Sequence, residues 1–345
     1  MDKSKFDTNG IGQDNGRFIG LPYTEEEAKI VMISVPWDTT VSYSDGTSTG
    51  PENIMKASLQ LDLFDPEVLD AWKLGIFLRP SDPKWKEWNN TTRPKAKKYI
   101  DFLESGGKIE DNSSMQGLLN EINRKHEQLN AEVYQQAKEV LANKQIACVV
   151  GGEHSVPLGL LKALKEKHSN FGVIHIDAHM DLRDRYEGFT YSHASIFNNA
   201  IKLNYIDQLV QVGIRDFCDQ EVDFAKQNGV KVFFDHQLKA NQYQGKAWHQ
   251  QCLKIIEPLP PKVYISFDID GLNPYLCPNT GTPVAGGMEF QESLYLIRLL
   301  VESGRQIIGF DLCEVGGLGH EWDGNVGARI LYKLCNWTGK SNGLI

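Results

Sequence analysis

The sequence predicts an α/β protein built on a mostly parallel sheet with helices on both faces. Short apolar runs alternate with amphipathic stretches from residue 145 to residue 337, which is the rhythm of repeated strand–helix–strand units. Several runs are apolar almost without interruption, as in Ile30-Val-Met-Ile33, and such strands are typical of sheets covered on both sides. Three runs end in aspartate or histidine, and the binding sites of open parallel sheets lie at those carboxyl ends.

The bulk composition indicates an ordinary globular protein. The chain has 345 residues, of which 41% are hydrophobic and 23% charged, and we expect a single domain over residues 1–345. The net charge of −9 disfavours a nucleic-acid partner, since phosphate binding needs a basic face. No apolar run approaches the roughly 18 residues of a membrane span, and residues 1–18 lack the apolar core of a signal peptide. The six cysteines form no C-x-x-C pair, which favours reduced, buried thiols in a cytoplasmic protein.

The N-terminal third mixes irregular and regular segments. Residues 1–28 have the composition of an irregular arm, and residues 29–36 form the first predicted strand. A helix is predicted to begin at Pro51, because proline in the first turn lacks only an N–H that the helix would not use. Residues 61–114 hold three tryptophans and several prolines, and we interpret them as an insertion with short helices, since long structureless loops are rare in compact domains. We expect the tryptophans to pack against the body, and a lid or a subunit contact is the alternative.

From residue 118 onward the predicted elements alternate regularly, beginning with a long amphipathic helix. The predicted strands are 145–151, 171–177, 207–213, 230–234, 262–268 and 305–311. The predicted helices are 118–144, 156–168, 193–203, 219–228, 245–256, 289–303 and 325–337. Because parallel strands joined by helices all end at the same edge of the sheet, side chains that follow different strands can meet there.

Polar side chains of the kind that bind metal ions follow three of these strands. They are His154 after the first, Asp177, His179 and Asp181 after the second, and Asp268 and Asp270 after the third. Residues two apart in an extended segment point the same way, so the members of each group can converge on one point. A single aspartate at a strand end is more often a helix cap or a turn residue, but three such groups together favour a metal site.

The donor set predicts the kind of metal. Two imidazoles and four carboxylates without a thiolate suit manganese, nickel or zinc. Six ligands are too many for one catalytic ion with an open position, but they suffice for two ions when carboxylates bridge, and a pair about 3.5–4 Å apart can activate water for attack on a carbon centre. His175 lies inside the apolar run, and we interpret it as a core residue or as a support for the ligands.

At these residues the chain resembles the ureohydrolase family, which includes arginases and agmatinases. The resemblance runs from about residue 30 to residue 337, except for residues 61–114. One motif is Gly151-Gly-Glu-His154-Ser, which is similar to the family's G-G-D-H-S with Glu153 in place of Asp. The others are Asp177-Ala-His-Met-Asp181, Ser266-Phe-Asp-Ile-Asp270 with Pro278–Pro283 and Gly286-Gly287, Phe310-Asp-Leu-Cys-Glu314, and Val35-Pro-Trp-Asp38 through Gly50-Pro51.

The resemblance implies a three-layer α/β/α fold with a central parallel sheet of eight strands. It implies two manganese ions, with nickel as the alternative, and hydrolysis of a guanidino group to urea and an amine. It also implies a homo-oligomer, a trimer or a hexamer. The acidic net charge and the lack of a long apolar run, described above, argue against a nucleic-acid or membrane partner.

The resemblance further implies a role for each site residue. Asp177 and Asp268 would bridge the two ions, His154 and Asp181 would complete one of them, and His179 and Asp270 the other. Asp181 would also orient the attacking hydroxide. Glu314 would hold the substrate cation by charge-assisted hydrogen bonds, and His193 would help to protonate the leaving amine.

The loop between Asp181 and His193 favours agmatine over arginine as substrate. It lacks the asparagine and hydroxyl cluster with which arginases bind the amino-acid end, and it carries Asp184 and Glu187 instead. Either carboxylate, if it faces the pocket, would favour a substrate with a distal amine. Guanidinobutyrate, free guanidine and formiminoglutamate stay open as substrates, as does a metal-binding relative without turnover. A zinc deacetylase of similar fold is disfavoured, because the sequence has no tandem His-His.

Overall fold

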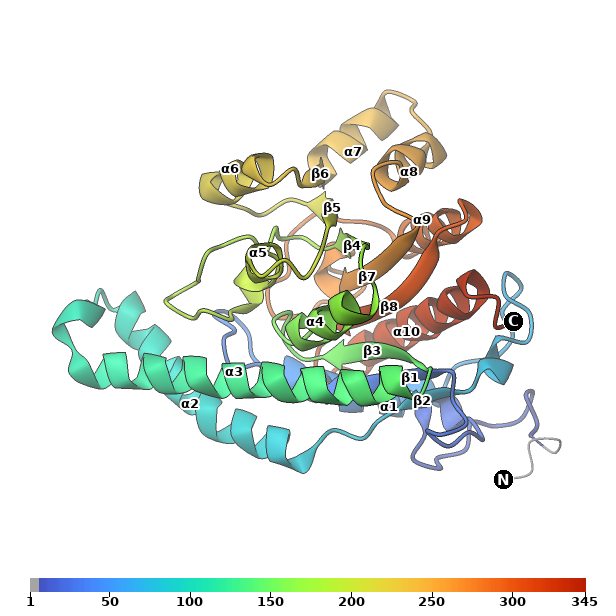
Figure 1. Cartoon of the computed structure of the whole chain (residues 1–345), viewed down its shortest axis with the longest axis horizontal. Coiled ribbons are helices and arrows are strands. Elements are labelled where there is room, and N and C mark those ends of the chain that lie inside the picture. The colour runs from blue at the N-terminus through green and yellow to red at the C-terminus, as the bar shows by residue number, and fades with distance from the viewer. Residues whose placement is uncertain (1–5) are drawn as a thin grey trace.

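The computed structural model describes residues 6–345 and is organised around one sheet of eight parallel strands, in the order β2-β1-β3-β8-β7-β4-β5-β6 (Figure 1). The strands are β1 Ile30–Val35, β2 Ile76–Leu78, β3 Ile146–Gly151, β4 Gly172–Ile176, β5 Gln208–Ile214, β6 Lys231–Phe234, β7 Lys262–Asp268 and β8 Gln306–Cys313. The eight-stranded sheet implied by the resemblance is therefore confirmed.

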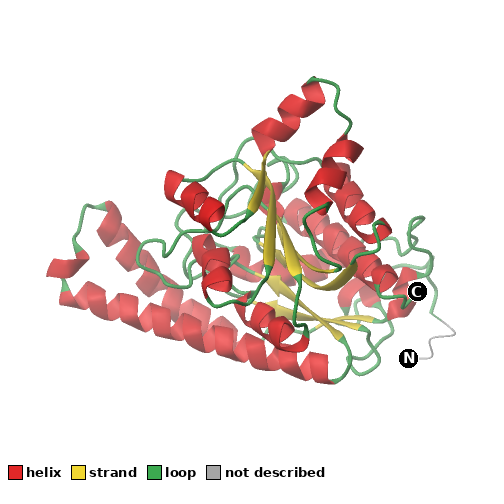
Figure 2. Ribbon diagram, turned by 45° about the horizontal axis from the view of Figure 1, so that its top comes forward, coloured by secondary structure: helices red, strands yellow, loops and turns green. Residues whose placement is uncertain are grey.

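Ten α-helices accompany the sheet in the described part of the chain (Figure 2). They are α1 Gly50–Ser58, α2 Pro83–Glu104, α3 Ser113–Ala142, α4 Leu158–Lys167, α5 Ile196–Lys202, α6 Asp219–Gln227, α7 Asp235–Tyr243, α8 Trp248–Ile256, α9 Phe290–Glu302 and α10 Glu321–Ser341. None of the helices within residues 6–345 is both long and apolar enough to cross a bilayer.

The helices form a layer on each face of the sheet, because the strand side chains alternate between two cores. Ile30 and Met32 of β1 belong to the core under α1, α8, α9 and α10. Val31 and Ile33 of the same strand belong to the core under α3, α4, α5 and α6. Both sets are fully buried, which explains why the strands read as continuous apolar runs. The predicted three-layer α/β/α architecture is confirmed.

Residues 61–114 differ from the prediction of short helices. They contain the edge strand β2, which pairs in parallel with β1, and the 22-residue helix α2. Asp82 caps α2 by accepting the N–H of Lys84, and Pro83 occupies the first turn. Pro94 lies inside the helix, where proline normally costs about 3 kcal/mol. Packing of α2 on α3 outweighs that cost.

The tryptophans of residues 61–114 pack against the body, as expected. Trp85 is buried, and its Nε1 donates to Glu132 on α3 at 2.6 Å. Trp88 lies beneath the ammonium groups of Lys84 and Lys125, at 4.9 and 4.1 Å from the ring centroid. Trp72 contacts the ring of Phe6 at 5.3 Å.

A third, smaller core ties the α2–α3 hairpin to the loop that follows β4. It contains Tyr99 and Met115 of the hairpin together with Phe189 of the loop. The rings of Tyr99 and Phe189 meet edge to face at 5.4 Å. Asn123 of α3 accepts the N–H of Thr190 at 2.9 Å, which adds a polar contact to the same junction. The hairpin is thus a packing partner of the loop that ends at the pocket.

The predicted helix boundaries also fail in places, and two helices show why. Helix α7 was not predicted, because it follows β6 without a loop and buries only Asp235 and Leu238. Helix α10 begins at Glu321, four residues before the predicted start, since its buried Asp323 is polar and does not read as a core position. Of the six cysteines, all free, five are buried as expected and Cys218 is half-buried.

Candidate metal centre

The predicted ligands follow neighbouring strands in the middle of the sheet. His154 follows β3, Asp177 follows β4, Asp268 ends β7, and Glu314 follows β8. These four strands lie side by side in the order β3-β8-β7-β4. Their carboxyl ends therefore bring together side chains that are up to 160 residues apart in the sequence, as for His154 and Glu314.

The carboxylate of Asp177 lies between the two predicted metal-binding imidazoles. Its Oδ2 is 3.1 Å from His154 Nδ1, and its Oδ1 is 3.4 Å from His179 Nδ1. The two oxygens of one side chain thus face two different histidines. A carboxylate placed in this way could offer one oxygen to each of two ions.

Each imidazole is further surrounded by carboxylate oxygens of the predicted set. His154 Nδ1 lies 3.1 Å from Asp268 Oδ2 and 3.4 Å from Asp181 Oδ2. His179 Nδ1 lies 3.2 Å from Asp270 Oδ2, an atom that is buried and has no hydrogen-bond partner within the described residues. The structure therefore brings all six predicted ligands into two adjoining groups, one around each histidine.

The chemistry of this cluster fits divalent cations. Burial, together with the neighbouring Asp270 and Asp177, raises the pKa of Asp268 well above its usual range. Burial and the nearby Asp177 raise the pKa of Asp181 to about 7. Four buried carboxylates beside two imidazoles can all remain ionised at neutral pH when cations compensate their charge. The orphaned Asp270 Oδ2 points to the same conclusion.

Supporting hydrogen bonds orient the histidine of the first group. Its second ring nitrogen, His154 Nε2, makes a hydrogen bond of 2.8 Å with Ser266 Oγ. Asp311 Oδ1 lies 3.3 Å from the same nitrogen but has no hydrogen-bond partner among the described residues. The other carboxylate oxygen of Asp311 accepts hydrogen bonds from Ser266 and Tyr264, both at 2.7 Å. A carboxylate behind a metal-binding imidazole fixes its tautomer and orientation. Sequence reasoning assigned no role to Asp311, although an aspartate inside an otherwise apolar strand was a visible signal.

Two more residues hold the cluster in place. His175 Nε2 lies 2.7 Å from Asp177 Oδ2, which agrees with the prediction that this histidine supports a ligand. Arg215 donates to the backbone carbonyls of Asp270 at 2.7 Å and of Val284 at 2.8 Å, and so ties the loop after β7 to the end of β5. Arg215 was missed because its partners are backbone carbonyls, which every residue type has, so no sequence pattern marks them.

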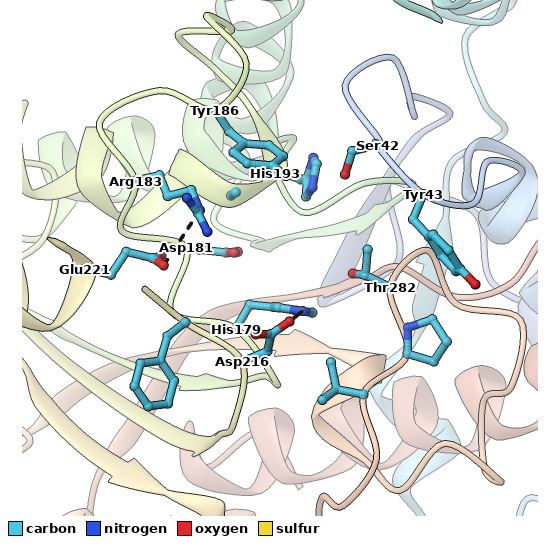
Figure 3. A pocket seen from close by; sticks show the side chains of 14 residues that line it. Ser42, Tyr43, His179, Asp181, Arg183, Tyr186, His193, Asp216, Glu221 and Thr282 are labelled. Atoms are coloured by element: carbon cyan, nitrogen blue, oxygen red, sulfur yellow. Dashed lines mark ion pairs between the residues drawn. The ribbon is translucent and has the colours of Figure 1, made fainter. Parts of the chain in front are cut away.

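A cavity of about 290 Å³ opens over the cluster (Figure 3). His179, Asp181 and His193 all line it. Asp181 and Glu314 have φ angles of 54° and 62°, in the left-handed region that non-glycine residues rarely adopt. Such backbone strain concentrates at functional sites, where the surrounding structure has to hold it.

Neither acidic residue that was expected to sense the substrate tail lines this pocket. Asp184 is exposed and pairs with Lys202 and Arg185. Glu187 is half-buried away from the pocket, where burial and the nearby Glu104 raise its pKa to about 7. The sequence shows that these charges are in the loop, but the direction of each side chain depends on tertiary contacts.

The rim of the pocket carries other charged residues instead. Asp216 and Arg183 both line it, and Figure 3 shows the Arg183 guanidinium directed toward Glu221. That ion pair spans 3.8 Å, and the guanidinium also lies 4.8 Å above the ring of Tyr186. Asp216 is largely exposed, and His179 lies 3.9 Å from it.

His193 and Glu314 hold different positions relative to the cavity. His193 lines the pocket, and burial together with the neighbouring His179 lowers its pKa to about 3. Glu314 lies deeper and is buried; its Oε1 accepts the N–H of His154 at 2.9 Å. Its Oε2 has no partner within the described residues. Gly281 approaches so closely that a Cβ there would lie 3.0 Å from this free oxygen.

Comparisons with known proteins agree with this fold. The model of the arginase family matches residues 28–334. N(1)-aminopropylagmatine ureohydrolase of Synechocystis sp. is 27% identical over 322 residues, covering 91% of this chain and 90% of the relative. Agmatinase of Halalkalibacterium halodurans is 29% identical over 292 residues, 84% of each chain. The crystal structure of agmatine ureohydrolase of Thermoplasma volcanium superposes with a TM-score of 0.71 at 22% identity, covering 95% of this chain and 96% of that one.

The fold, the buried cluster of imidazoles and carboxylates and these similarities define a metal-dependent hydrolase with a three-layer α/β/α fold. The chain belongs to the arginase family and resembles its agmatinase-like ureohydrolases. It is therefore a hydrolase that acts on guanidino compounds, and the resemblance inferred from its motifs is confirmed.

Proposed function

We propose that the chain hydrolyses agmatine, or a similar guanidino compound with a distal amine, to urea and an amine, using two manganese ions held by the six predicted ligands. The observation that carries the proposal is the position of Asp177, whose two oxygens face His154 and His179, and His179 lines the pocket. The ions, when bound, lower the pKa of water and so supply a nucleophile for the weakly electrophilic guanidinium carbon.

The residues of the chain bind, orient and move protons around that reaction. Glu314 offers a free, buried carboxylate oxygen that accepts hydrogen bonds from the planar guanidinium. Asp181, on the pocket floor, accepts a hydrogen bond from the attacking water and orients it. His193 is a neutral imidazole on the pocket wall, which can take up one proton and pass it to the leaving amine.

The charges at the pocket rim support a substrate with a distal amine. The positive charge of Arg183 is compensated by Glu221, and its guanidinium stacks on Tyr186. Asp216 has no Lys or Arg partner among the described residues. Tyr43 and Phe217 add aromatic surface beside it, on which an ammonium group can rest. A rim of this kind favours a cationic tail over a carboxylate. Because Tyr43 and Asp216 are open to solvent, a longer amine such as N(1)-aminopropylagmatine is the second candidate.

A substrate panel tests the proposal. Urea release is measured for agmatine, N(1)-aminopropylagmatine, arginine, guanidinobutyrate and free guanidine at identical metal loading, after elemental analysis of the purified protein. We expect two divalent ions per chain and the highest kcat/KM for one of the two amines. A preference for arginine or guanidinobutyrate would contradict the rim argument, and one ion or none at saturation would contradict the two-ion site. We also propose a cytoplasmic homo-oligomer, to be tested by light scattering and fractionation.

A further inference from the structure

Glu153 departs from the family motif that the chain otherwise resembles, and its surroundings show where the longer side chain reaches. It is fully buried beside His154. Its Oε2 accepts the backbone N–H of Thr40 at 2.6 Å. Its Oε1 accepts the hydroxyl hydrogens of Thr40 at 2.9 Å and of Ser155 at 2.6 Å. Both oxygens of Glu153 therefore act as acceptors toward Thr40.

Thr40 links this carboxylate to His193 in the pocket wall. The Thr40 hydroxyl has a single hydrogen, which it donates to Glu153, so its oxygen can only accept from other partners. It accepts the backbone N–H of His193 at 3.2 Å, and His193 Nδ1 lies 3.3 Å away. The contact with Nδ1 is a hydrogen bond only when Nδ1 carries the hydrogen.

We propose that Glu153 is a positioning residue that acts through Thr40 to hold His193 in the tautomer with hydrogen on Nδ1. His193 Nε2, which makes no hydrogen bond within the described residues, is then the nitrogen that exchanges a proton in the pocket. Figure 3 shows the His193 ring at the pocket, near Tyr186. The inference rests on the proposed role of His193 in proton transfer, but it concerns a ground-state property that can be measured without substrate.

Ser192 is the competing partner of the same nitrogen. Its Oγ lies 3.4 Å from His193 Nδ1 and already accepts the N–H of Ala194 at 3.2 Å. Its hydroxyl hydrogen could be donated to Nδ1, which would reverse the tautomer. A Ser192→Ala variant removes this alternative and leaves the Glu153–Thr40 pair in place.

The test reads the tautomer directly by 15N NMR of protein labelled in its histidines, at neutral pH, because protonated and unprotonated ring nitrogens have separate resonances. The His193 signals are assigned by their loss in His193→Asn. We expect hydrogen on Nδ1 in the parent protein and in Ser192→Ala. Thr40→Val, which keeps the shape but lacks the hydroxyl, should lose this preference, and Thr40→Ser should restore it.

A second variant, Glu153→Gln, tests the same proposal if Thr40→Val does not fold. In Glu153→Gln the amide oxygen has to face the Thr40 N–H, which can only donate, so the NH2 group faces the two hydroxyls. The Thr40 hydroxyl then turns toward His193 Nδ1 and moves the hydrogen to Nε2. A parent protein with hydrogen on Nε2, or an unchanged tautomer in both Thr40→Val and Glu153→Gln, would overturn the proposal.

Kinetics separate this inference from the proposed function. We expect kcat to fall at least about tenfold in Thr40→Val, with KM and metal content unchanged. A positioned acid or base contributes about 10²–10⁴-fold to the rate, and losing the preferred tautomer should remove part of that contribution. A reversed tautomer in a protein that releases no urea from any guanidino compound would support the positioning and contradict the function. Normal kcat together with a reversed tautomer would overturn the link between the two.

Discussion

At the scale of single residues, the two oxygens of each carboxylate in the metal centre have different partners. Asp268 Oδ1 accepts the N–H of Asp270 at 2.8 Å, which leaves Oδ2 to face His154. Asp270 Oδ1 accepts the N–H of Ala178 at 3.0 Å, which leaves Oδ2 to face His179. One oxygen of each side chain therefore fixes the backbone, and the other is available to a cation.

Asp268→Asn should abolish most turnover and reduce the metal content. The amide can still accept the N–H of Asp270, so the loop is retained, but the charge that faces His154 is lost. Even supporting residues of metal sites cost about 10–100-fold when changed, so a ligand should cost at least about 100-fold in kcat/KM. The control is Asp184→Asn, the same change on the exposed surface. Near-normal activity in Asp268→Asn would show that this carboxylate is not a ligand.

Glu314→Gln should lower kcat/KM while the metal content stays normal. The amide oxygen can replace Oε1 as acceptor for the His154 N–H, so the fold of the strand end is kept. The free oxygen becomes a donor without charge, and the lost charge-assisted contact is worth about 1.5–3 kcal/mol, or at least about tenfold. Elemental analysis accompanies the kinetics, because loss of metal would instead make Glu314 a ligand or a structural residue.

At the scale of elements, the turn after β3 has no space for a side chain at position 152. A Cβ on Gly152 would lie 2.1 Å from the carbonyl oxygen of Trp37, a backbone atom that cannot move aside alone. The Gly152 N–H also donates to the carbonyl of Val35 at 3.0 Å. Glycine at this position therefore lets the chain turn directly from the sheet into the segment that carries His154.

Gly152→Ala should consequently lower the free energy of unfolding by about 1–3 kcal/mol or more, which is the usual cost of overpacking. Gly117→Ala is the matched control, because Gly117 lies on an exposed face of α3 with no atom within 4 Å of the added Cβ. Alanine in a helix is favoured over glycine, so this control should gain about 0.5–1 kcal/mol. Denaturant unfolding of both variants measures the difference, and equal effects would contradict the steric argument.

The sequence predicts the elements whose burial is uniform and misses those whose formation depends on neighbours. The central strands are apolar on both faces, so their positions and ends are visible in the sequence. Strand β2 has only three residues and exists through its pairing with β1. Helix α2 contains Pro94 and is held by α3 through contacts such as Lys84–Glu132 at 2.6 Å. In both cases the deciding contacts are distant in sequence.

The same distinction applies to the site. The six ligands were predicted because strand ends bring them together whatever the details of the loops. The sequence could not predict roles that depend on the direction of a side chain. Asp184, for example, points to Lys202, whereas Asp216 lines the pocket. The partners of Glu153 were equally hidden, since Thr40 lies 113 residues away.

At the scale of the whole molecule, buried histidines make stability depend on pH. His126 is buried, and both of its ring nitrogens lack partners among the described residues. Burial, together with the neighbouring His193, lowers its pKa from 6.5 to about 3. The unfolded chain therefore binds one more proton than the folded chain between about pH 6.5 and 3. Stability from this histidine is fully present above that window and is lost as the pH falls through it.

His126→Phe should remove this contribution. We expect the metal-free parent to lose up to about 1.4 kcal/mol of stability per pH unit from His126 within the window, and the variant to lack that part of the slope. The measurement is the free energy of unfolding of both proteins from neutral pH to pH 4, compared as a difference so that the carboxylates cancel. Parallel curves would show that His126 is charged, or solvated, in the folded chain.

The small core that joins Tyr99 and Met115 to Phe189 has a consequence for how the molecule opens. Because this core is separate from the two large ones, the α2–α3 tip and the loop over residues 186–190 can unfold together without disturbing the sheet. Amide hydrogen exchange should therefore give both segments one shared opening free energy, below that of global unfolding. Phe189→Ala should accelerate exchange at the tip of the hairpin as much as in the loop. Access to the pocket would then be coupled to a segment that does not line the pocket itself.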